Sequence, residues 1–246
     1  MDSDIATKIE HLTILKESYE SCTKCPKLCE TRSNIVFGIG SPSPDIMVIA
    51  EAPGGTEDTR GVPLIGDSGR LLDYLLSVAS EDDRLTKLSK SFSFSRGGFG
   101  KNAYLWPDHE KAKAILCERI FYTNTILCWP GKGNRDPEPT EIENCKDRLL
   151  KTVYIADPKI IISVGAFAAK TLMNKRSFSI TKERGRLHDV TVPGTHIGIK
   201  YPVISILHPA YLMRNPDFEN SDGIWAATKK DLKKVFQLVG ELNKCS

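Results

Sequence analysis

The chain has 246 residues, of which 40% are hydrophobic and 26% are charged. This composition is typical of a globular protein, and we expect residues 1–246 to form a single domain. No apolar run is long enough to span a membrane, and the acidic, amphipathic first segment is unlike a secretory signal peptide. The net charge of +3 is too small to indicate nucleic-acid binding by itself.

The first part of the chain predicts two helices and one strand. Residues 45–50 form a short apolar run between turn signals, which is typical of a buried strand. Apolar residues at helical spacing predict an opening helix that ends near Cys22. Its expected inner face carries Ile5, Ile9, Leu12 and Leu15. The helix after the strand has Asp67 or Ser68 as its expected N-cap. Its apolar face carries Leu71, Leu72, Leu75 and Leu76.

The second part of the chain predicts three more strands, at 119–127, 159–164 and 202–207. Thr140 with Glu143 fits a capping box that begins a helix carrying Cys145. A short helix is expected over 166–173, and a final helix over about 224–242. The expected inner stripe of the final helix is Trp225, Thr228, Leu232, Val235 and Val239.

Strands and helices alternate along the chain, which predicts an α/β fold. We expect a three-layer α/β/α sandwich around a central, mostly parallel, four-stranded sheet. Residues 80–116 are polar, Gly-rich and aromatic, and we expect them to form an irregular insertion at the edge of the sheet. Binding sites in such sheets lie at the carboxyl ends of the strands. Glu51 and His208 directly follow predicted strands, and Asn124 lies within one, so these three are candidate site residues.

Seven cysteines, an odd number in a chain too long for a disulfide miniprotein, favour reduced thiols and a cytoplasmic location. Cys22 and Cys25 form a C-x-x-C pair, and Cys128 and Cys145 follow much later in the chain. Four thiolates from two distant segments are the ligand set of either a structural zinc ion or an iron–sulfur cluster.

Four segments together resemble the family 4 uracil-DNA glycosylases, the iron–sulfur branch of the uracil-DNA glycosylase superfamily. They are C-T-K-C-P-K-L-C-E-T-R, I-A-E-A-P-G-G, the stretch from T-N-T-I-L-C to G-N-R-D-P, and V-I-S-I-L-H-P-A-Y-L-M-R-N-P. Each segment alone is a weak signal, but the four occur in the order that the family has. The resemblance covers most of the chain apart from residues 80–116 and the final helix.

The resemblance implies an enzyme that flips a pyrimidine out of DNA and hydrolyses its N-glycosidic bond to leave an abasic site. In that case Glu51 orients the water, His208 donates to O2 of the leaving base, and Asn124 reads the base edge. Other expected base contacts are Ala52, Gly54, Glu57 and Leu64. Expected DNA contacts are Ser68, Tyr211, Leu212 and Arg214, with Leu212 as an apolar wedge. We expect DNA as the partner, no membrane association and a monomer.

By the same resemblance, Cys22, Cys25, Cys128 and Cys145 would ligate a [4Fe–4S] cluster with a structural role. A structural zinc ion is the alternative, because the spacing alone suits both. Cys29 follows Cys25 by four residues and is a further candidate ligand, although an ordinary small residue is the simpler interpretation.

Three positions depart from the family pattern. Relatives usually carry a Phe that stacks on the extruded base, where this chain has Leu64. Gly55 and Thr56 also stand where relatives tend to be acidic. We therefore weigh two substrates equally: uracil, which implies DNA repair, and a bulky C5-modified pyrimidine of viral DNA, which implies antiviral defence.

Two other functional classes compete with the glycosylase interpretation. An iron–sulfur redox protein would explain the cysteines but not the polar residues at three strands. The second class is a non-catalytic DNA-binding module with a structural zinc ion. The chain has no basic loop with a reactive His after Asn124, so we expect hydrolysis and a free abasic product.

Overall fold

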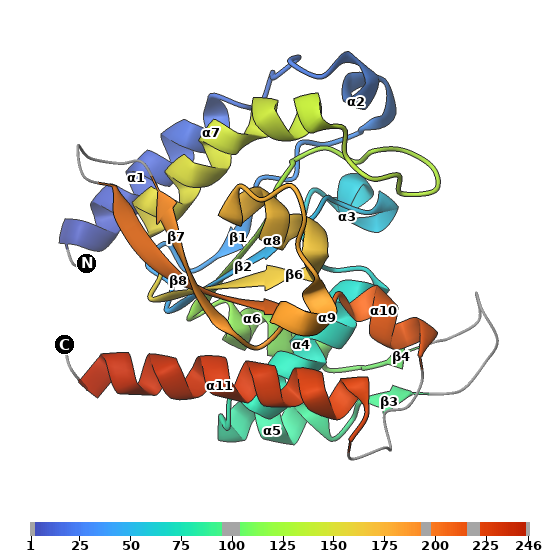
Figure 1. The fold of residues 1–246 in the computed structure, drawn as a ribbon, viewed down its shortest axis with the longest axis vertical. Coiled ribbons are helices and arrows are strands. Elements are labelled where there is room, and N and C mark those ends of the chain that lie inside the picture. The colour runs from blue at the N-terminus through green and yellow to red at the C-terminus, as the bar shows by residue number, and fades with distance from the viewer. Residues whose placement is uncertain (1–2, 95–103, 193–197, 216–221, 245–246) are drawn as a thin grey trace.

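The computed structural model describes residues 3–94, 104–192, 198–215 and 222–244. In these ranges the larger sheet has six strands in the order β1-β5-β2-β6-β8-β7, with helices on both of its faces (Figure 1). The strands are β1 (Ile39–Gly40), β2 (Ile46–Ala50), β5 (Ile120–Asn124), β6 (Ile160–Val164), β7 (Leu187–Val192) and β8 (Ile199–Ile206). The three-layer α/β/α prediction is confirmed.

The four predicted strands are the four parallel strands at the centre of the sheet, β5, β2, β6 and β8. Every residue of β2, β5 and β6 is buried, as expected for strands covered on both faces. The predicted number of four strands is wrong, because β1 and β7 add antiparallel edges. The sequence signal for both edges is weak, since β1 has two residues and β7 is partly exposed.

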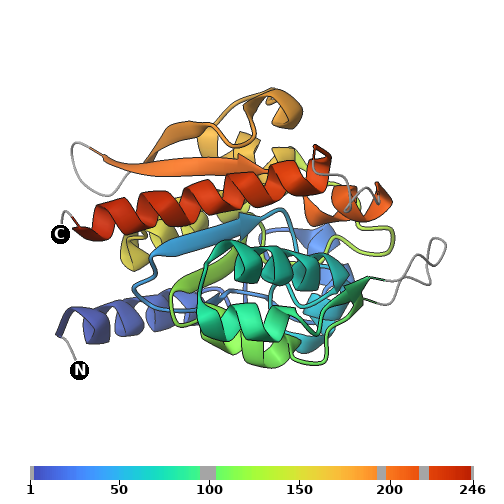
Figure 2. The same cartoon turned by 90° about the horizontal axis from the view of Figure 1, so that it is seen from below.

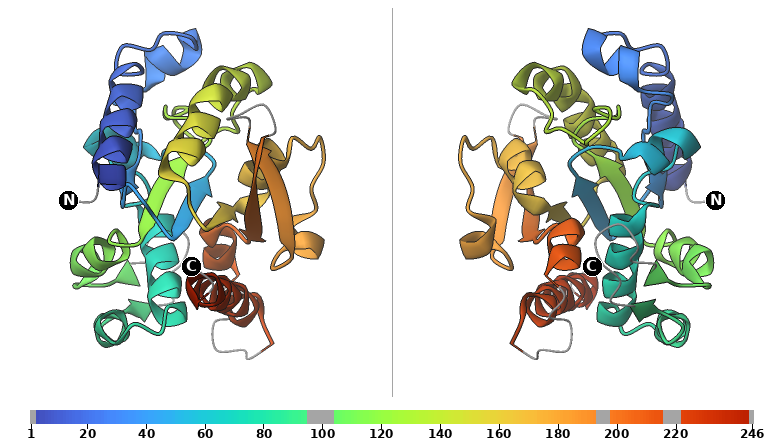
Figure 3. Two further views of the ribbon diagram at one scale, coloured as in Figure 1. Left: turned by 90° about the vertical axis from the view of Figure 1, so that its left-hand side faces the viewer. Right: turned by 90° about the vertical axis from the view of Figure 1, so that its right-hand side faces the viewer.

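Helices cover both faces of the sheet, as the views in Figures 2 and 3 show. One face packs against α4 (Asp67–Ala79), α5 (Asp83–Ser89), α6 (His109–Leu116), α10 (Pro209–Arg214) and α11 (Ile224–Lys244). The other packs against α1 (Ser3–Glu17), α2 (Pro26–Thr31), α7 (Pro139–Ala156) and α8 (Gly165–Met173). Two short helices, α3 (Gly55–Arg60) and α9 (Ile180–Glu183), lie in connections. No helix within the described ranges is long and apolar enough to cross a membrane.

Three details of the predicted helices are wrong. Helix α1 ends at Glu17 and leaves Ile9 43% exposed, so its buried face is shorter than its apolar pattern. Gly66 precedes α4 as its N-cap, without a side-chain cap. The capping box of α7 is formed by Glu138 and Glu141, because Pro139 occupies the first turn one residue before Thr140. The predicted inner stripe of α11 is confirmed, since all five of its residues are buried.

The insertion at 80–116 is more regular than predicted. It contains α5, α6 and the two-stranded sheet of β3 (Ser93–Phe94) and β4 (Tyr104–Leu105), while residues 95–103 lie outside the described part of the chain. Helices α5 and α6 pack on α4 and on each other. Their lengths of 7 and 8 residues give the sequence too few turns for a clear helical period.

Parallel pairing brings the carboxyl ends of the central strands to one edge of the sheet. Ala50 of β2 is paired with Asn124 of β5, and Val164 of β6 is paired with Ile206 of β8. Glu51 directly follows β2, and His208 is the N-cap of α10, two residues after β8. The segments that carry the three candidate site residues therefore meet at this edge.

Candidate active site

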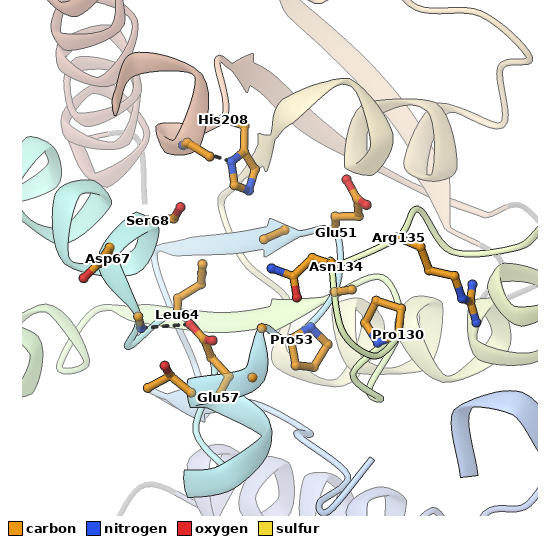
Figure 4. Close-up of a pocket in the computed structure, with 18 of the residues that line it drawn as sticks. Glu51, Pro53, Glu57, Leu64, Asp67, Ser68, Pro130, Asn134, Arg135 and His208 are labelled. Carbon is orange, nitrogen blue, oxygen red and sulfur yellow. Dashed lines mark hydrogen bonds between the residues drawn. The ribbon is translucent and has the colours of Figure 1, made fainter. Parts of the chain in front are cut away.

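A cavity of about 810 Å³ opens at the carboxyl ends of β2 and β8. Glu51, Leu64, Ser68, Asn134 and His208 surround it from four segments of the chain (Figure 4). This volume is toward the upper end of the range of about 300–1,000 Å³ for pockets that enclose small molecules. The predicted carboxylate and the predicted histidine thus line one cavity.

Glu51 is a partly buried carboxyl group with an unusual pKa. Burial, with a smaller contribution from the nearby carboxylate of Asp136, raises the pKa of Glu51 to about 7, and Lys170 partly opposes this shift. A group with this pKa changes its charge near neutral pH, which suits a residue that must orient or activate water. The turn around Glu51 is fixed by Thr125 and Ile126, which donate hydrogen bonds to its backbone carbonyl.

His208 is held as a neutral ring with a defined tautomer. Its Nδ1 accepts a hydrogen bond from the backbone N–H of Ala210 over 3.2 Å, so the ring proton lies on Nε2. Burial lowers the pKa of His208 to about 4, with a further contribution from the positive charge of Arg214. Gly165 lies against the ring at φ +85°, and a Cβ there would approach the His208 Cβ to 3.2 Å. The geometry therefore gives a neutral hydrogen-bond donor.

Asn124 is paired with Ala50, which lines the cavity, but is not itself part of the lining. It is 1% exposed, and neither Oδ1 nor Nδ2 has a hydrogen-bond partner within the described residues. Alternation along β5 places its side chain on the same face as Tyr122, whose core cluster also contains Leu64. A buried amide without a partner costs about 1–3 kcal/mol. Such a group has its hydrogen-bonding capacity available for a ligand.

Leu64 and Glu57 form the wall opposite His208. Leu64 has a left-handed backbone with φ 55° and a buried side chain. Oε1 of Glu57 accepts hydrogen bonds from the backbone N–H groups of Ile65 at 3.1 Å and Gly66 at 2.8 Å. A Cβ on Gly54 would lie 2.7 Å from Oε2 of Glu57, so a larger residue would displace this carboxylate. Glu57 therefore fixes the loop that presents Leu64.

The remaining predicted residues, the base contact Ala52 and the DNA contacts Ser68, Tyr211, Leu212 and Arg214, lie in three different environments. Ala52, Ser68 and Arg214 line the cavity, and the Ser68 hydroxyl lies 3.9 Å from the sulfur of Met213. Tyr211 is exposed but lies outside the lining. Leu212 is 0% exposed and packs in the core, because α10 turns that face toward α4 and α11. This position does not agree with a wedge that enters DNA.

The loop that carries G-N-R-D-P contains none of the predicted site residues. Asn134 and Arg135 line the cavity from this loop. The indole N–H of Trp129 donates to Oδ1 of Asn134 over 2.8 Å, and Arg135 forms a two-pronged ion pair with Glu141 at 2.7 and 2.9 Å. The Pro- and Gly-rich composition was the available signal, since rigid irregular loops commonly carry binding residues.

The four predicted cysteine ligands lie together in the core between the sheet and helices α1, α2, α7 and α8. Cys22, Cys25, Cys128 and Cys145 belong to one cluster, and Cys25 and Cys128 each lie within electrostatic range of the other two. Burial raises the pKa of the Cys128 thiol to about 11. Among the described residues, no three His, Cys, Asp or Glu side chains are arranged to hold a metal ion. The four thiols are thus brought together from two distant parts of the chain.

Polar groups surround these thiols. Nη1 of Arg32 lies 3.1 Å from the Cys128 sulfur, while its Nη2 donates to the Cys22 carbonyl over 2.6 Å. Nδ2 of Asn144 lies 3.4 Å from the Cys25 sulfur. The Cys29 thiol is directed to the Cys22 carbonyl at 3.9 Å. Four thiols with nearby donors have the chemistry of an iron–sulfur or zinc ligand set.

Comparison with known proteins now decides the family. The family model described as "Uracil DNA glycosylase superfamily" matches residues 37–233, which is most of the chain and includes the whole cavity lining. The chain belongs to the uracil-DNA glycosylase superfamily. The sequence resemblance is confirmed, and the chain is a DNA N-glycosylase by family.

Several curated members of the superfamily align over most of their length. The type-4 uracil-DNA glycosylase of Archaeoglobus fulgidus is 28% identical over 236 residues, which are 95% of this chain and 96% of that protein. The type-4 enzyme of Saccharolobus solfataricus is 31% identical over 92% of this chain and 86% of its own. The type-4 enzyme of Thermotoga maritima is also 31% identical, over 85% of this chain and 86% of its own.

Proposed function

We propose that this chain flips a pyrimidine out of DNA and hydrolyses its N-glycosidic bond, with Glu51, His208 and Asn124 as the working residues. The base must leave the stack, because the bond is inaccessible inside a duplex. The observation that carries the proposal is the joint position of Glu51 and His208 on one cavity, with pKa values displaced in opposite directions. Such a pair is typical of an enzyme site that separates a charged role from a neutral one.

The two residues would act on opposite sides of the breaking bond. The sugar gains positive charge as the base departs, and the Glu51 carboxylate would stabilise it and orient the attacking water. The base gains negative charge on O2, where the Nε2–H of His208 would donate a hydrogen bond. A neutral imidazole suits this step, because its Nε2–H can stabilise the negative charge on O2 by a hydrogen bond while the ring keeps its proton.

Asn124 would read the Watson–Crick edge of the flipped base. Its amide both donates and accepts, so it can pair with N3–H and O4 of uracil. Both amide atoms are buried without a partner in the described structure, which supports this role. The opposite amide orientation would suit a cytosine-type edge, so Asn124 does not by itself decide the base.

We propose two classes of substrate for the same site, uracil and a pyrimidine with a bulky C5 substituent. Family membership and the named relatives favour uracil. Leu64 favours the second class, because it removes an aromatic platform from the wall beside the base. Gly55 is a second departure from the family pattern in the cavity lining, and a Cβ there would make only an ordinary van der Waals contact with the Trp129 ring. The two imply different biology, namely repair of the cell's own DNA or excision of modified bases from viral DNA.

We further propose that Cys22, Cys25, Cys128 and Cys145 hold a [4Fe–4S] cluster, with a structural zinc ion as the alternative. The gathered thiols beside Arg32 support this assignment. A bound group would join the N-terminal segment to α7 and brace the surface beside the cavity. Purified protein that absorbs in the visible and contains iron supports the cluster, whereas stoichiometric zinc in a colourless protein supports the alternative.

The abasic strand is expected to be released uncut. A strand-cutting step through a Schiff base needs an amine at the sugar. In the described part of the chain the lining of the cavity contains no lysine. This supports a monofunctional hydrolase.

The test is a panel of substrates scored for abasic sites. Oligonucleotides with a single uracil are compared with viral DNA that carries C5-modified cytosine or uracil, and an aldehyde-reactive probe counts the sites. Excision from uracil alone supports repair, and excision from modified DNA alone supports defence. Excision from neither contradicts the proposal. The matched control is Glu51→Gln, which keeps the shape of the side chain and removes its charge.

A further inference from the structure

A pair of opposite charges is buried behind the wall that carries Leu64. Asp73 of α4 is 0% exposed, and its carboxylate lies 3.2 Å from Nζ of Lys113 on α6. Nε2 of His109 lies 2.8 Å from the same carboxylate. Lys113 is 7% exposed, so protein surrounds its ammonium almost completely. Burying two charges is costly, and apolar residues of similar volume often give equal or greater stability. Stability alone therefore does not explain why this pair is buried here.

The ammonium of Lys113 contacts both segments that are proposed to bind the base. Its Nζ donates to the backbone carbonyl of Leu64 over 3.4 Å. The same Nζ lies 3.3 Å from the centre of the Tyr122 ring, within the range of a cation–π contact. Tyr122 precedes Asn124 by two residues on β5 and faces the same side. One side chain thus joins the Leu64 loop to the strand that ends at Asn124.

The Leu64 loop needs such support because its backbone conformation is unfavourable. A left-handed conformation costs a residue with a side chain about 1–2 kcal/mol. Glu57 holds the loop through the N–H groups of Ile65 and Gly66. Gly69 allows α4 to pass beneath it, since a Cβ there would meet the Leu64 carbonyl at 2.1 Å. Lys113 is the side-chain donor to that carbonyl among the described residues.

We propose that Lys113, with Asp73 as its counter-ion, is a positioning residue that fixes the base-binding wall through the Leu64 carbonyl. The inference rests on the proposed function for what the wall binds, but its contacts are independent of it. It also assigns a role to the insertion at 80–116: α6 supplies a support for the pocket from behind. Lys113 does not line the cavity, so its effect on the reaction passes through Leu64.

The competing interpretation is that the pair only joins α6 to α4. Two neutral double variants separate the alternatives: Asp73→Asn with Lys113→Gln, and Asp73→Asn with Lys113→Met. Both remove the two charges, leave an amide beside His109 and keep a similar length at position 113. Only Gln at that position can donate a hydrogen bond to the Leu64 carbonyl.

The first readout is hydrogen exchange at the amides of Ile65 and Gly66, which requires no activity. We expect the Met variant to exchange at these amides at least tenfold faster than the Gln variant, with melting temperatures that agree. The second readout is base release. We expect kcat to fall about 10- to 100-fold in the Met variant and much less in the Gln variant, because small misplacements of a bound group slow the chemistry. KM for DNA should stay similar, since phosphate contacts dominate it.

Equal exchange and equal kcat in the two variants would overturn the proposal. If the wild-type protein releases no base from any DNA, the proposed function fails, while the exchange comparison still decides the role of Lys113. If neither double variant folds, nuclear magnetic resonance of the wild-type protein decides it. A scalar coupling between Lys113 Nζ and the Leu64 carbonyl carbon is expected, and an ordered ammonium without that coupling would refute the contact.

Discussion

The Nδ1 atom of His208 accepts the backbone N–H of Ala210 across 3.2 Å, and this contact leaves Nε2 as the donor of the ring. Burial lowers the pKa of the ring to about 4, so the donor stays neutral throughout the physiological range. We expect nitrogen resonances of His208 that report the Nε2–H tautomer from about pH 8 down to about pH 5.5. Protonation with an ordinary midpoint near pH 6.5 would contradict this assignment.

Removing this donor should slow the reaction without unfolding the protein. His208→Ala is expected to lower kcat about 10²- to 10³-fold, the usual effect of deleting one donor to a developing negative charge. The measurement is single-turnover release of base. His208→Gln is the matched control, because its amide can still donate to O2, and we expect it to retain more activity than Ala.

Glu51 should control the acidic limb of the pH–rate profile. Burial, with a contribution from Asp136, raises the pKa of Glu51 to about 7, and its proposed role needs the carboxylate. We therefore expect kcat/KM to rise with pH and to level off above about pH 7. Asp136→Asn removes a repelling charge, so it should move this limb to lower pH. If Asp136→Asn leaves the acidic limb unchanged, a group other than Glu51 controls it.

The same pKa shift predicts a cost in stability. The pKa of Glu51 is about 7 in the folded protein against an ordinary 4.5, so the folded state binds protons more tightly. Folding stability must then fall as pH rises from about 4.5 to 7. At pH 8 the free energy of unfolding of Glu51→Gln should therefore exceed that of the wild type by about 1–3 kcal/mol, after allowance for partial exposure. Denaturant titration measures this difference. At pH 4.5 the difference should vanish, and a gap independent of pH would contradict the linkage.

The sequence predicted the centre of the sheet and two catalytic candidates for the same reason. Strands β2 and β8 are apolar runs closed by a polar residue or loop, so Glu51 and His208 stand out where chemistry occurs in such sheets. The opposite displacement of their pKa values depends on burial and on Asp136 and Arg214, which the strand pattern does not contain.

The parts that escaped prediction depend on packing between distant segments. The sequence predicts Leu212, beside Arg214, as a wedge that enters DNA, but α10 directs its side chain into the core. Lys113 is not among the predicted core or site residues, and only the packing of α6 on α4 places it behind Leu64. Contacts between residues 40 or 49 positions apart, such as those of Lys113 with Asp73 and Leu64, leave no periodic trace in one sequence.

Leu64 offers the most direct test of substrate choice. Leu64→Phe places an aromatic ring on the wall beside the proposed base, and stacking on such a ring contributes about 1–3 kcal/mol per base. If the site has been altered for a bulkier base, this change should raise kcat/KM for uracil about 5- to 100-fold and lower it for C5-modified DNA. The matched control is Leu64→Met, which nearly conserves volume and adds no ring. Only a ring in the space of the C5 substituent should change kcat/KM for the two substrates in opposite directions. An equal gain in kcat/KM from Leu64→Met, or a gain on both substrates, would therefore show that side-chain volume or loop stability governs substrate choice.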